Sequence, residues 1–163
     1  MRVAPDGMTE SDPGVDEPWY RRTARGALAG CAATALMSAV QWPLAFASGE
    51  DPPPVQIMKR VNAVLPGRTP RTTVVRRATV AHFAFGAGAG ALYGLLAPRR
   101  FREGTGIAYA GLIWGTSYLG WLPALHLHPS VPRDDRGRQI GNAAGHLVYG
   151  IALAEGMRLT RPR

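Results

Sequence analysis

The sequence predicts an all-α, polytopic membrane protein: a four-helix transmembrane bundle with one short amphipathic helix in a loop. The first observation is the distribution of charge, which is absent from four long intervals: 26–49, 78–98, 104–132 and 139–154. A helix needs roughly 20 apolar residues to cross a bilayer, and the first three intervals are longer than that. The second observation is that small residues recur four positions apart in all four intervals, a spacing that suits helix contacts in lipid.

A water-soluble helical domain is the alternative class for a chain of 163 residues. Its helices would carry charged side chains every turn or two on their wetted faces, and these intervals carry none. The mean hydropathy of -0.07 is near neutral because polar loops and a polar tail are averaged with the apolar intervals. We therefore expect an acidic, disordered tail over residues 1–20 and a single four-helix transmembrane domain over residues 21–163.

The first transmembrane helix is expected at about residues 24–48. Trp19 and Tyr20 mark a membrane interface, and three arginines follow them closely. A cleaved signal peptide is the alternative, since the arginines resemble its basic region and Ala45 and Ala47 offer a cleavage site. The uncharged stretch exceeds the roughly 7–15 apolar residues of such a peptide, so we expect the helix to be retained.

A short amphipathic helix is expected at about residues 52–65, in the loop after the first transmembrane helix. Asp51 can cap its N-terminus, and prolines occupy its first positions. Its apolar residues recur at three- to four-residue spacing: Val55, Met58, Val61 and Leu65. Two placements are open, because the apolar side can face the membrane surface or pack on the end of the bundle itself.

The remaining transmembrane helices are expected at about residues 76–97, 104–125 and 139–158. Arginines crowd the side that would hold both termini, close to the helix ends. On the other side, acidic residues accompany the arginines: Glu50, Asp51, Asp134 and Asp135. Because loops rich in Lys and Arg stay in the cytoplasm, we expect cytoplasmic termini and a multi-pass protein of the bacterial cytoplasmic (inner) membrane.

Nine glycines form the expected helix-packing faces, because glycine lets two backbones approach closely where no hydrophobic force drives helices together. They are Gly26 and Gly30 in the first helix, Gly86, Gly90 and Gly94 in the second, Gly111 and Gly115 in the third, and Gly141 and Gly145 in the fourth.

The second and fourth helices share a pattern at an offset of 64 residues, the distance from His82 to His146. The first and third align more weakly at an offset of 79, the distance from Trp42 to Trp121. We expect two parallel helical-hairpin repeats related by a pseudo-two-fold axis along the membrane normal. Chance similarity in a biased composition is the alternative.

His82 and His146 are the candidate functional residues, because an ionisable side chain inside a membrane helix is costly. Three interpretations are open: hydrogen-bonded packing residues, a pair that carries protons or senses pH, or ligands that hold a haem between facing helices. His126 and His128, in the loop before the two aspartates, offer at most a weak site for a divalent metal.

The sequence holds no nucleophile–base pair, no cysteine–histidine metal spacing and no carboxylate dyad. We therefore expect no enzyme, no catalytic residue, no metal site and no cofactor. The net charge of +8 does not indicate nucleic-acid binding, because the arginines flank the apolar intervals where lipid headgroups attract them. The expected partners are the lipid bilayer and either a second copy of the chain or another membrane protein.

Four segments carry a resemblance to a known family: "GALAGCAATALMSAVQWPLA", "GAGALYGLLAP", "SYLGWLPAL" and "GHLVYGIAL". In order and spacing they resemble the YagU-like family of uncharacterised bacterial inner-membrane proteins, over roughly residues 24–160. The resemblance implies a small polytopic membrane protein of unassigned biochemistry with a loose link to acid tolerance, and it implies no ligand residues.

The leading expectation for function is a structural or envelope-stress role through helix–helix contacts. The first alternative is a small proton-linked transporter or channel that uses His82 and His146. The second alternative is a haem-binding helical bundle.

Overall fold

The computed structural model describes residues 17–97, 103–128 and 134–162. The all-α class is confirmed, since these residues form helices and no strand. The elements are α1 (Trp19–Ala47), α2 (Pro53–Ala63), α3 (Arg71–Leu96), α4 (Glu103–Gly115), the π-helical segment η1 (Thr116–Trp121), α5 (Leu122–Ala124) and α6 (Arg136–Leu159).

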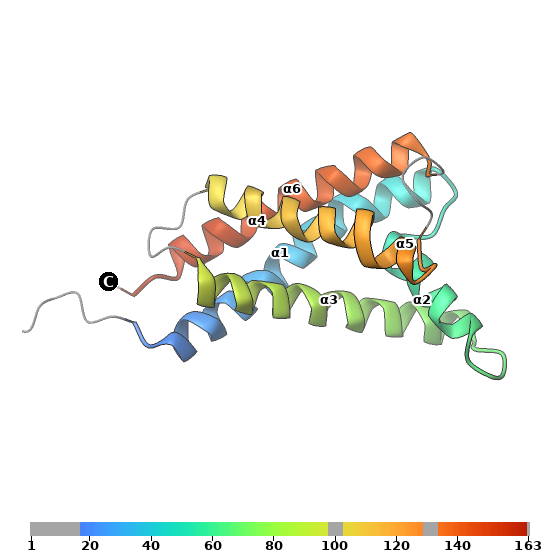
Figure 1. Ribbon diagram of the computed structural model, residues 1–163, viewed down its shortest axis with the longest axis horizontal. Coiled ribbons are helices and arrows are strands. Elements are labelled where there is room, and N and C mark those ends of the chain that lie inside the picture. The colour runs from blue at the N-terminus through green and yellow to red at the C-terminus, as the bar shows by residue number, and fades with distance from the viewer. Residues whose placement is uncertain (1–16, 98–102, 129–133, 163) are drawn as a thin grey trace, which may run out of the picture.

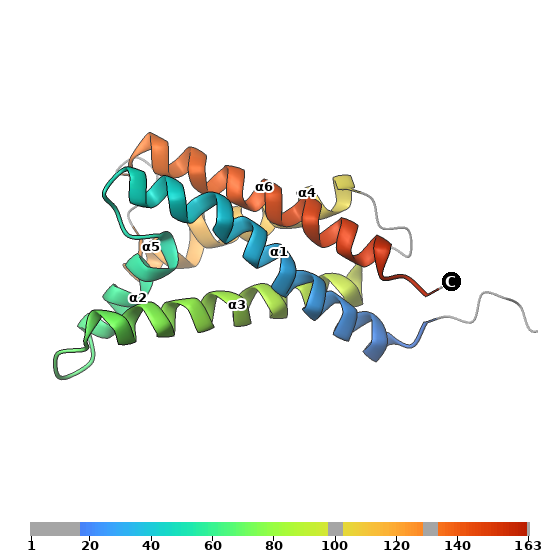
Figure 2. The same cartoon turned by 180° about the vertical axis from the view of Figure 1, so that it is seen from behind.

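Four long helical segments run alternately up and down in the molecule, and α2 lies across one end (Figures 1 and 2). The third of them is the continuous run α4–η1–α5, which covers the helix expected at 104–125. α1 and α3 begin earlier than the expected spans, directly after Pro18 and Pro70. Proline suits that position because its missing N–H would have no partner in the first turn.

Glycines of α1 and α3 bring the two backbones into direct contact. A Cβ atom added at Gly90 would lie 2.7 Å from the Cα of Gly30, and closer still to the carbonyl oxygen of Gly26. One turn later, Gly94 meets the backbone of Arg22 in the same way, and one turn earlier a Cβ added at Gly86 would overlap the side chain of Thr34. The five expected packing glycines of these two helices therefore lie in one contact, whereas a Cβ added at Gly88 of α3 would meet nothing within 4 Å.

The other four expected packing glycines are placed differently. A Cβ added at Gly111 or Gly115 would meet nothing within 4 Å, and one at Gly141 would meet only Leu44, at 3.9 Å. Gly145 does face another helix, but it accommodates the side chain of Gln41 rather than a backbone. The expectation of a glycine contact through Gly111 and Gly115 is wrong, because these residues lie on the outer part of their helix.

α4 instead packs on α6 through residues outside the expected set. A Cβ added at Gly106 would lie 2.8 Å from that of Ala154, and one at Gly150 would lie 2.9 Å from that of Ala110. This contact repeats the one between α1 and α3. Gly86 and Gly150 correspond at the offset of 64, and Gly30 then corresponds to Gly106 at an offset of 76 rather than 79.

The outer surface of the bundle carries large apolar side chains. Leu28, Val80, Leu112 and Ile140 are each more than 60% exposed, and they come from four different helical segments. α1 and α3 are each long and apolar enough to cross a membrane. Only 33% and 22% of their most apolar windows are buried inside the protein, whereas the core helix of a soluble protein would be mostly buried.

α2 packs on the end of the bundle, which is the second of its two expected placements. Val55 is buried against Val74 and Ala78 of α3. The helix begins after Pro52, and Asp51 does not cap it as expected. The Asp51 carboxylate accepts hydrogen bonds from Lys59 and from Arg71 instead, which ties the residues before α2 to α2 itself and to the start of α3.

Candidate functional site

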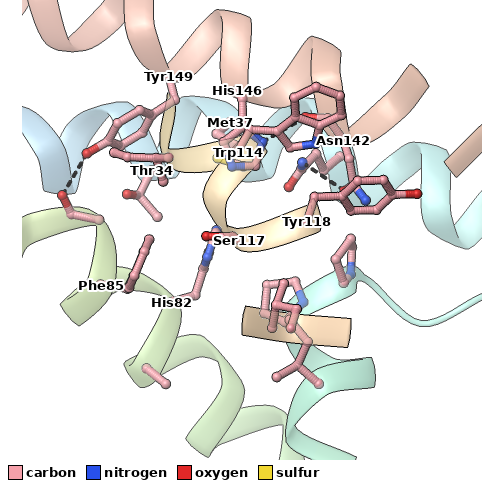
Figure 3. Close-up of a pocket in the computed structure, with 18 of the residues that line it drawn as sticks. Thr34, Met37, His82, Phe85, Trp114, Ser117, Tyr118, Asn142, His146 and Tyr149 are labelled. Carbon is pink, nitrogen blue, oxygen red and sulfur yellow. Dashed lines mark hydrogen bonds between the residues drawn. The ribbon is translucent and has the colours of Figure 1, made fainter. Parts of the chain in front are cut away.

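A cavity of about 260 Å³ lies inside the bundle, toward the end that α2 covers. Its walls come from α1, α2, α3, α6 and the continuous run α4–η1–α5 (Figure 3). Most of the lining is apolar or aromatic, and no Asp, Glu, Lys or Arg is among the described residues that line it. Phe85 and Trp121 line it although they are 52% and 43% exposed, so the cavity opens on the side of the bundle between α3 and η1.

The two candidate histidines line this same cavity from two helices, His82 from α3 and His146 from α6 (Figure 3). His146 Nδ1 lies 2.8 Å from the carbonyl oxygen of Asn142, one turn earlier in α6. His82 Nε2 is buried and has no hydrogen-bond partner among the described residues. The structure thus brings together, at one cavity, the pair that sequence position singled out.

Gln41 and Asn142 form a second polar pair beside the histidines. The Gln41 side-chain amide of α1 donates a hydrogen bond of 3.3 Å to the Asn142 side chain of α6, and both residues are buried. Gly145 makes room for this bond, because a Cβ there would lie 2.7 Å from Gln41 Cγ. Sequence reasoning missed this pair, although each is an amide side chain within an uncharged interval, and that pattern could have marked them.

The glycine contact closes the cavity toward the middle of the bundle. The Tyr149 hydroxyl of α6 donates a hydrogen bond of 2.8 Å to the carbonyl oxygen of Gly86. Thr34 of α1 packs on Gly86 from the other side and donates to the carbonyl oxygen of Gly30 at 2.8 Å. These contacts fix three helices relative to one another at the cavity wall (Figure 3).

The π-helical segment η1 forms another wall. At its end the Leu122 N–H donates to the carbonyl of Ser117, five residues back instead of four. Three residues in or beside this irregular turn disfavour a regular α-helix. Pro123 has no backbone N–H to donate, and Gly115 and Gly120 are poor helix formers. Such segments are common at functional sites. Here the segment supplies Ser117, Tyr118 and Trp121 to the cavity lining, and Trp114 before it stacks on Tyr118 with ring centroids 5.5 Å apart.

A buried ion pair lies at the α2 end of the cavity. The Asp134 carboxylate is fully buried; it accepts a hydrogen bond from Tyr118 and forms an ion pair of 2.8 Å with Arg138 Nε. Arg138 also donates to Glu50 at 3.0 Å and to Gln56 at 2.9 Å, so it links α6 to the loop before α2 and to α2 itself. Sequence position alone had shown Asp134 only as an acidic loop residue.

The loop histidines do not act together. His128 is buried, and its Nε2 lies 3.9 Å from an Asp134 oxygen. His126 is exposed, and its carbonyl oxygen accepts a hydrogen bond of 2.9 Å from Arg60. The described residues hold no group of three or more His, Cys, Asp or Glu that could bind a metal ion, so the weak metal site weighed for this loop has no ligand set there.

A second, polar cleft of about 560 Å³ opens at the end of the bundle beside α2. Charged and amide side chains line it, among them Glu50, Gln56 and Arg138. Gln41 and Asn142 line both the cleft and the cavity, so their hydrogen bond stands between the two.

Comparisons with protein-family models, with curated proteins and with solved structures found no match.

Proposed function

We propose that the chain is a four-span integral membrane protein of the bacterial cytoplasmic membrane that binds a small molecule inside its bundle. The observation that carries the proposal is the cavity: polar side chains from α1, α3 and α6 converge in it, within a helix bundle whose outer surface is apolar. Binding sites for small molecules combine largely apolar walls with a few polar groups in this manner.

The membrane location is supported by the distribution of side chains between inside and outside. Gln41 and Asn142 are buried, whereas Leu28 and Ile140 are 73% and 69% exposed. In water this arrangement would expose apolar surface and bury polar groups, and in lipid the same arrangement satisfies both. α1 and α3 supply two spans, and the long uncharged intervals of α4–η1–α5 and α6 supply the other two.

The similarity of the four sequence segments to the YagU-like family supports the proposed membrane location. α1 is part of the mature protein in this proposal, because Gly26 and Gly30 form its main contact with α3. Alkaline carbonate washing of membranes tests the location: the untagged chain should stay in the pellet. Recovery of folded, monodisperse chain in the high-speed supernatant without detergent would refute a membrane-spanning bundle.

Filling the cavity tests the binding function. Ser117→Phe places a ring in the cavity, and Thr116→Phe is the matched control, since Thr116 is exposed and does not line the cavity. Small molecules extracted from the purified proteins are compared by mass spectrometry. The proposal expects a compound that accompanies the wild type and Thr116→Phe and is lost from Ser117→Phe. Identical extracts from all three would instead favour the purely structural role that the sequence suggested first.

Proton-linked transport is the second candidate function, and one observation favours it. Between the polar cleft and the cavity, Gln41 bonds to the Asn142 side chain, and the Asn142 carbonyl bonds to His146. This series of polar groups leads from water toward a histidine, the side chain that most readily exchanges protons near neutral pH. Proton flux into proteoliposomes should fall in His82→Ala and in His146→Ala, and unchanged flux in both would refute this candidate.

The absorption spectrum of the purified protein tests the haem-binding alternative. A haem held between His82 and His146 would give the purified protein an intense absorption band near the blue end of the visible spectrum. The proposed binding of a small molecule without haem expects no such band, and a band that disappears in His146→Ala would assign haem to the cavity instead.

A further inference from the structure

Two buried nitrogen atoms beside the cavity have no hydrogen-bond partner among the described residues. They are Trp114 Nε1 and His82 Nε2, which belong to different helices, and both residues line the cavity. A buried polar atom without a partner costs considerably more than one that is paired. Indole N–H can only donate, so whatever pairs with Trp114 must carry a hydrogen-bond acceptor. His82 Nε2 donates a hydrogen bond when the ring carries its proton on that atom, and in this tautomer His82 can serve the same molecule.

The chemistry of the walls limits the charge of the ligand. None of the described residues that line the cavity is an Asp, Glu, Lys or Arg, so an ionic ligand would lose its hydration without gaining a permanent counter-charge. Apolar and aromatic side chains, including Met37, Phe85 and Ile113, make up most of the lining. An uncharged, mainly apolar molecule is the chemical class that these walls accept.

The volume and shape of the cavity limit the size of the ligand. A cavity of about 150 Å³ is enough to bind benzene, so about 260 Å³ has room for a single ring with substituents. Trp114 and Tyr118 stack with an angle of 13° between their rings, and this pair presents a flat aromatic surface at the cavity. A planar ring fits against such a surface.

The opening of the cavity indicates the route of entry. Phe85 and Trp121, two lining residues with exposed side chains, lie on the side of the bundle. If the bundle spans a membrane, as proposed above, this side faces lipid, and a ligand that enters here must first dissolve in the bilayer.

From these observations, and resting on the proposed function, we propose that the cavity binds an uncharged, lipid-soluble ring compound that carries carbonyl oxygens, of the kind found in a quinone ring. One oxygen accepts a hydrogen bond from Trp114 Nε1, and His82 donates to the same molecule. The ring lies between the Trp114–Tyr118 stack and the apolar side chains of α3.

The test compares two probes of the same shape. Duroquinone has two carbonyl oxygens and no free ring position at which the thiol of Cys31 could add, and durene is the corresponding tetramethylbenzene without oxygens. The full-length protein in lipid nanodiscs is dialysed to equilibrium against each probe, and protein-free nanodiscs of the same lipid are subtracted. We expect saturable binding of duroquinone near one molecule per chain, tighter than that of durene.

Substitutions then locate the oxygen contact. Trp114→Phe removes the N–H and keeps a ring, and it should weaken duroquinone binding roughly fivefold, the effect of one hydrogen bond, while durene binding stays within about twofold. Trp42→Phe is the matched control, because Trp42 Nε1 is also buried and unpaired but Trp42 does not line the cavity. Durene binding also reports that each variant is folded.

Three results would overturn the ligand class: equal affinity for the two probes, an unchanged duroquinone affinity in Trp114→Phe, or an equal loss in Trp42→Phe. If the two probes bind equally, or if Trp114→Phe changes nothing, the cavity can still be a binding site. Saturable durene binding that is lost in Ser117→Phe would show this. Failure of both probes to bind, together with identical extracts from wild type and Ser117→Phe, would remove the binding function as well.

Discussion

At the scale of single residues, the contact of α1 with α3 depends on glycines that cannot be replaced even by alanine. The atoms that a Gly90 side chain would meet are backbone atoms of Gly26 and Gly30, which cannot rotate away as a flexible side chain can. Gly111 lies in a helix of the same bundle, but nothing lies within 4 Å of its hypothetical Cβ. The two positions therefore form a matched pair for a substitution.

Gly90→Ala should destabilise the protein by about 1–3 kcal/mol, the usual range for an overpacked contact. Gly111→Ala should leave stability unchanged or raise it slightly, because alanine is the better helix former. Thermal unfolding of the detergent-solubilised proteins measures both. Equal midpoints for the two variants would contradict the direct backbone contact.

The residue scale also shows which site residues the sequence could reveal. His82 and His146 were found from sequence because an ionisable group within an uncharged interval is conspicuous, and the structure places both at one cavity. Trp114 could not be found in this way, since an aromatic residue in an apolar helix most often packs. Its importance depends on the unpaired Nε1 atom, which only the three-dimensional arrangement shows.

At the scale of elements, α2 is held to the bundle by a small apolar contact. Val55 is buried against Val74 and Ala78, whereas Val64, just past the end of the helix, is 82% exposed.

Val55→Ala removes two buried carbon groups, and it should lower the stability of the α2 attachment by about 1.5 kcal/mol, at about 0.8 kcal/mol for each group. Val64→Ala should cost nothing. Limited trypsin digestion measures the difference, because Lys59 and Arg60 become better cleavage sites when α2 detaches.

The ion pairs around Asp51 add a pH dependence to the same attachment. The hydrogen bond from Lys59, together with the charges of Lys59 and Arg71, holds the pKa of the Asp51 carboxyl below its ordinary value of 3.8. A carboxyl with a lowered pKa in the folded state stabilises that state above its ordinary pKa, and this stabilisation is lost as the pH falls through the folded-state value.

Asp51→Asn should therefore lower the unfolding midpoint slightly at neutral pH, since exposed ion pairs contribute about 1 kcal/mol or less. The difference from the wild type should shrink as the pH falls below about 4. Unfolding curves of both proteins over this range provide the measurement. A difference that stays constant down to the lowest pH would show that the charge of Asp51 has no part in it.

Elements were more predictable from the sequence than the contacts between them. The uncharged intervals located the four long helical segments, because charged residues are confined to the ends of these segments. The packing of α4 on α6 was missed, since only glycine was considered. The pairs Gly106 with Ala110 and Gly150 with Ala154 show the same four-residue spacing once alanine is allowed. The π-helical turn depends on Pro123 and on the surrounding side chains, and no periodicity of the sequence indicates it.

At the scale of the whole molecule, the two ends of the bundle differ in charge. The end that holds both termini carries Arg21 and Arg22 close to the start of α1, while at the α2 end Arg138 lies in contact with Asp134 and Glu50. The proposed orientation puts the termini in the cytoplasm.

A phosphatase fusion, which is active only outside the cytoplasm, should be active when inserted at Ser48 and inactive at the C-terminus. The reverse pattern of activity would show the opposite orientation in the membrane, with the polar cleft on the cytoplasmic side.

The backbone contact of α1 with α3 has a mechanical consequence for the whole molecule. Each glycine of this contact is followed by a residue with a larger side chain, so a movement of either helix by one residue along and around its axis would place a Cβ atom against the other helix. We therefore expect α1 and α3 to keep the same position relative to each other. For the same reason, we expect the movement that admits a molecule to the interior in the other walls of the cavity, which include the wide turn of η1.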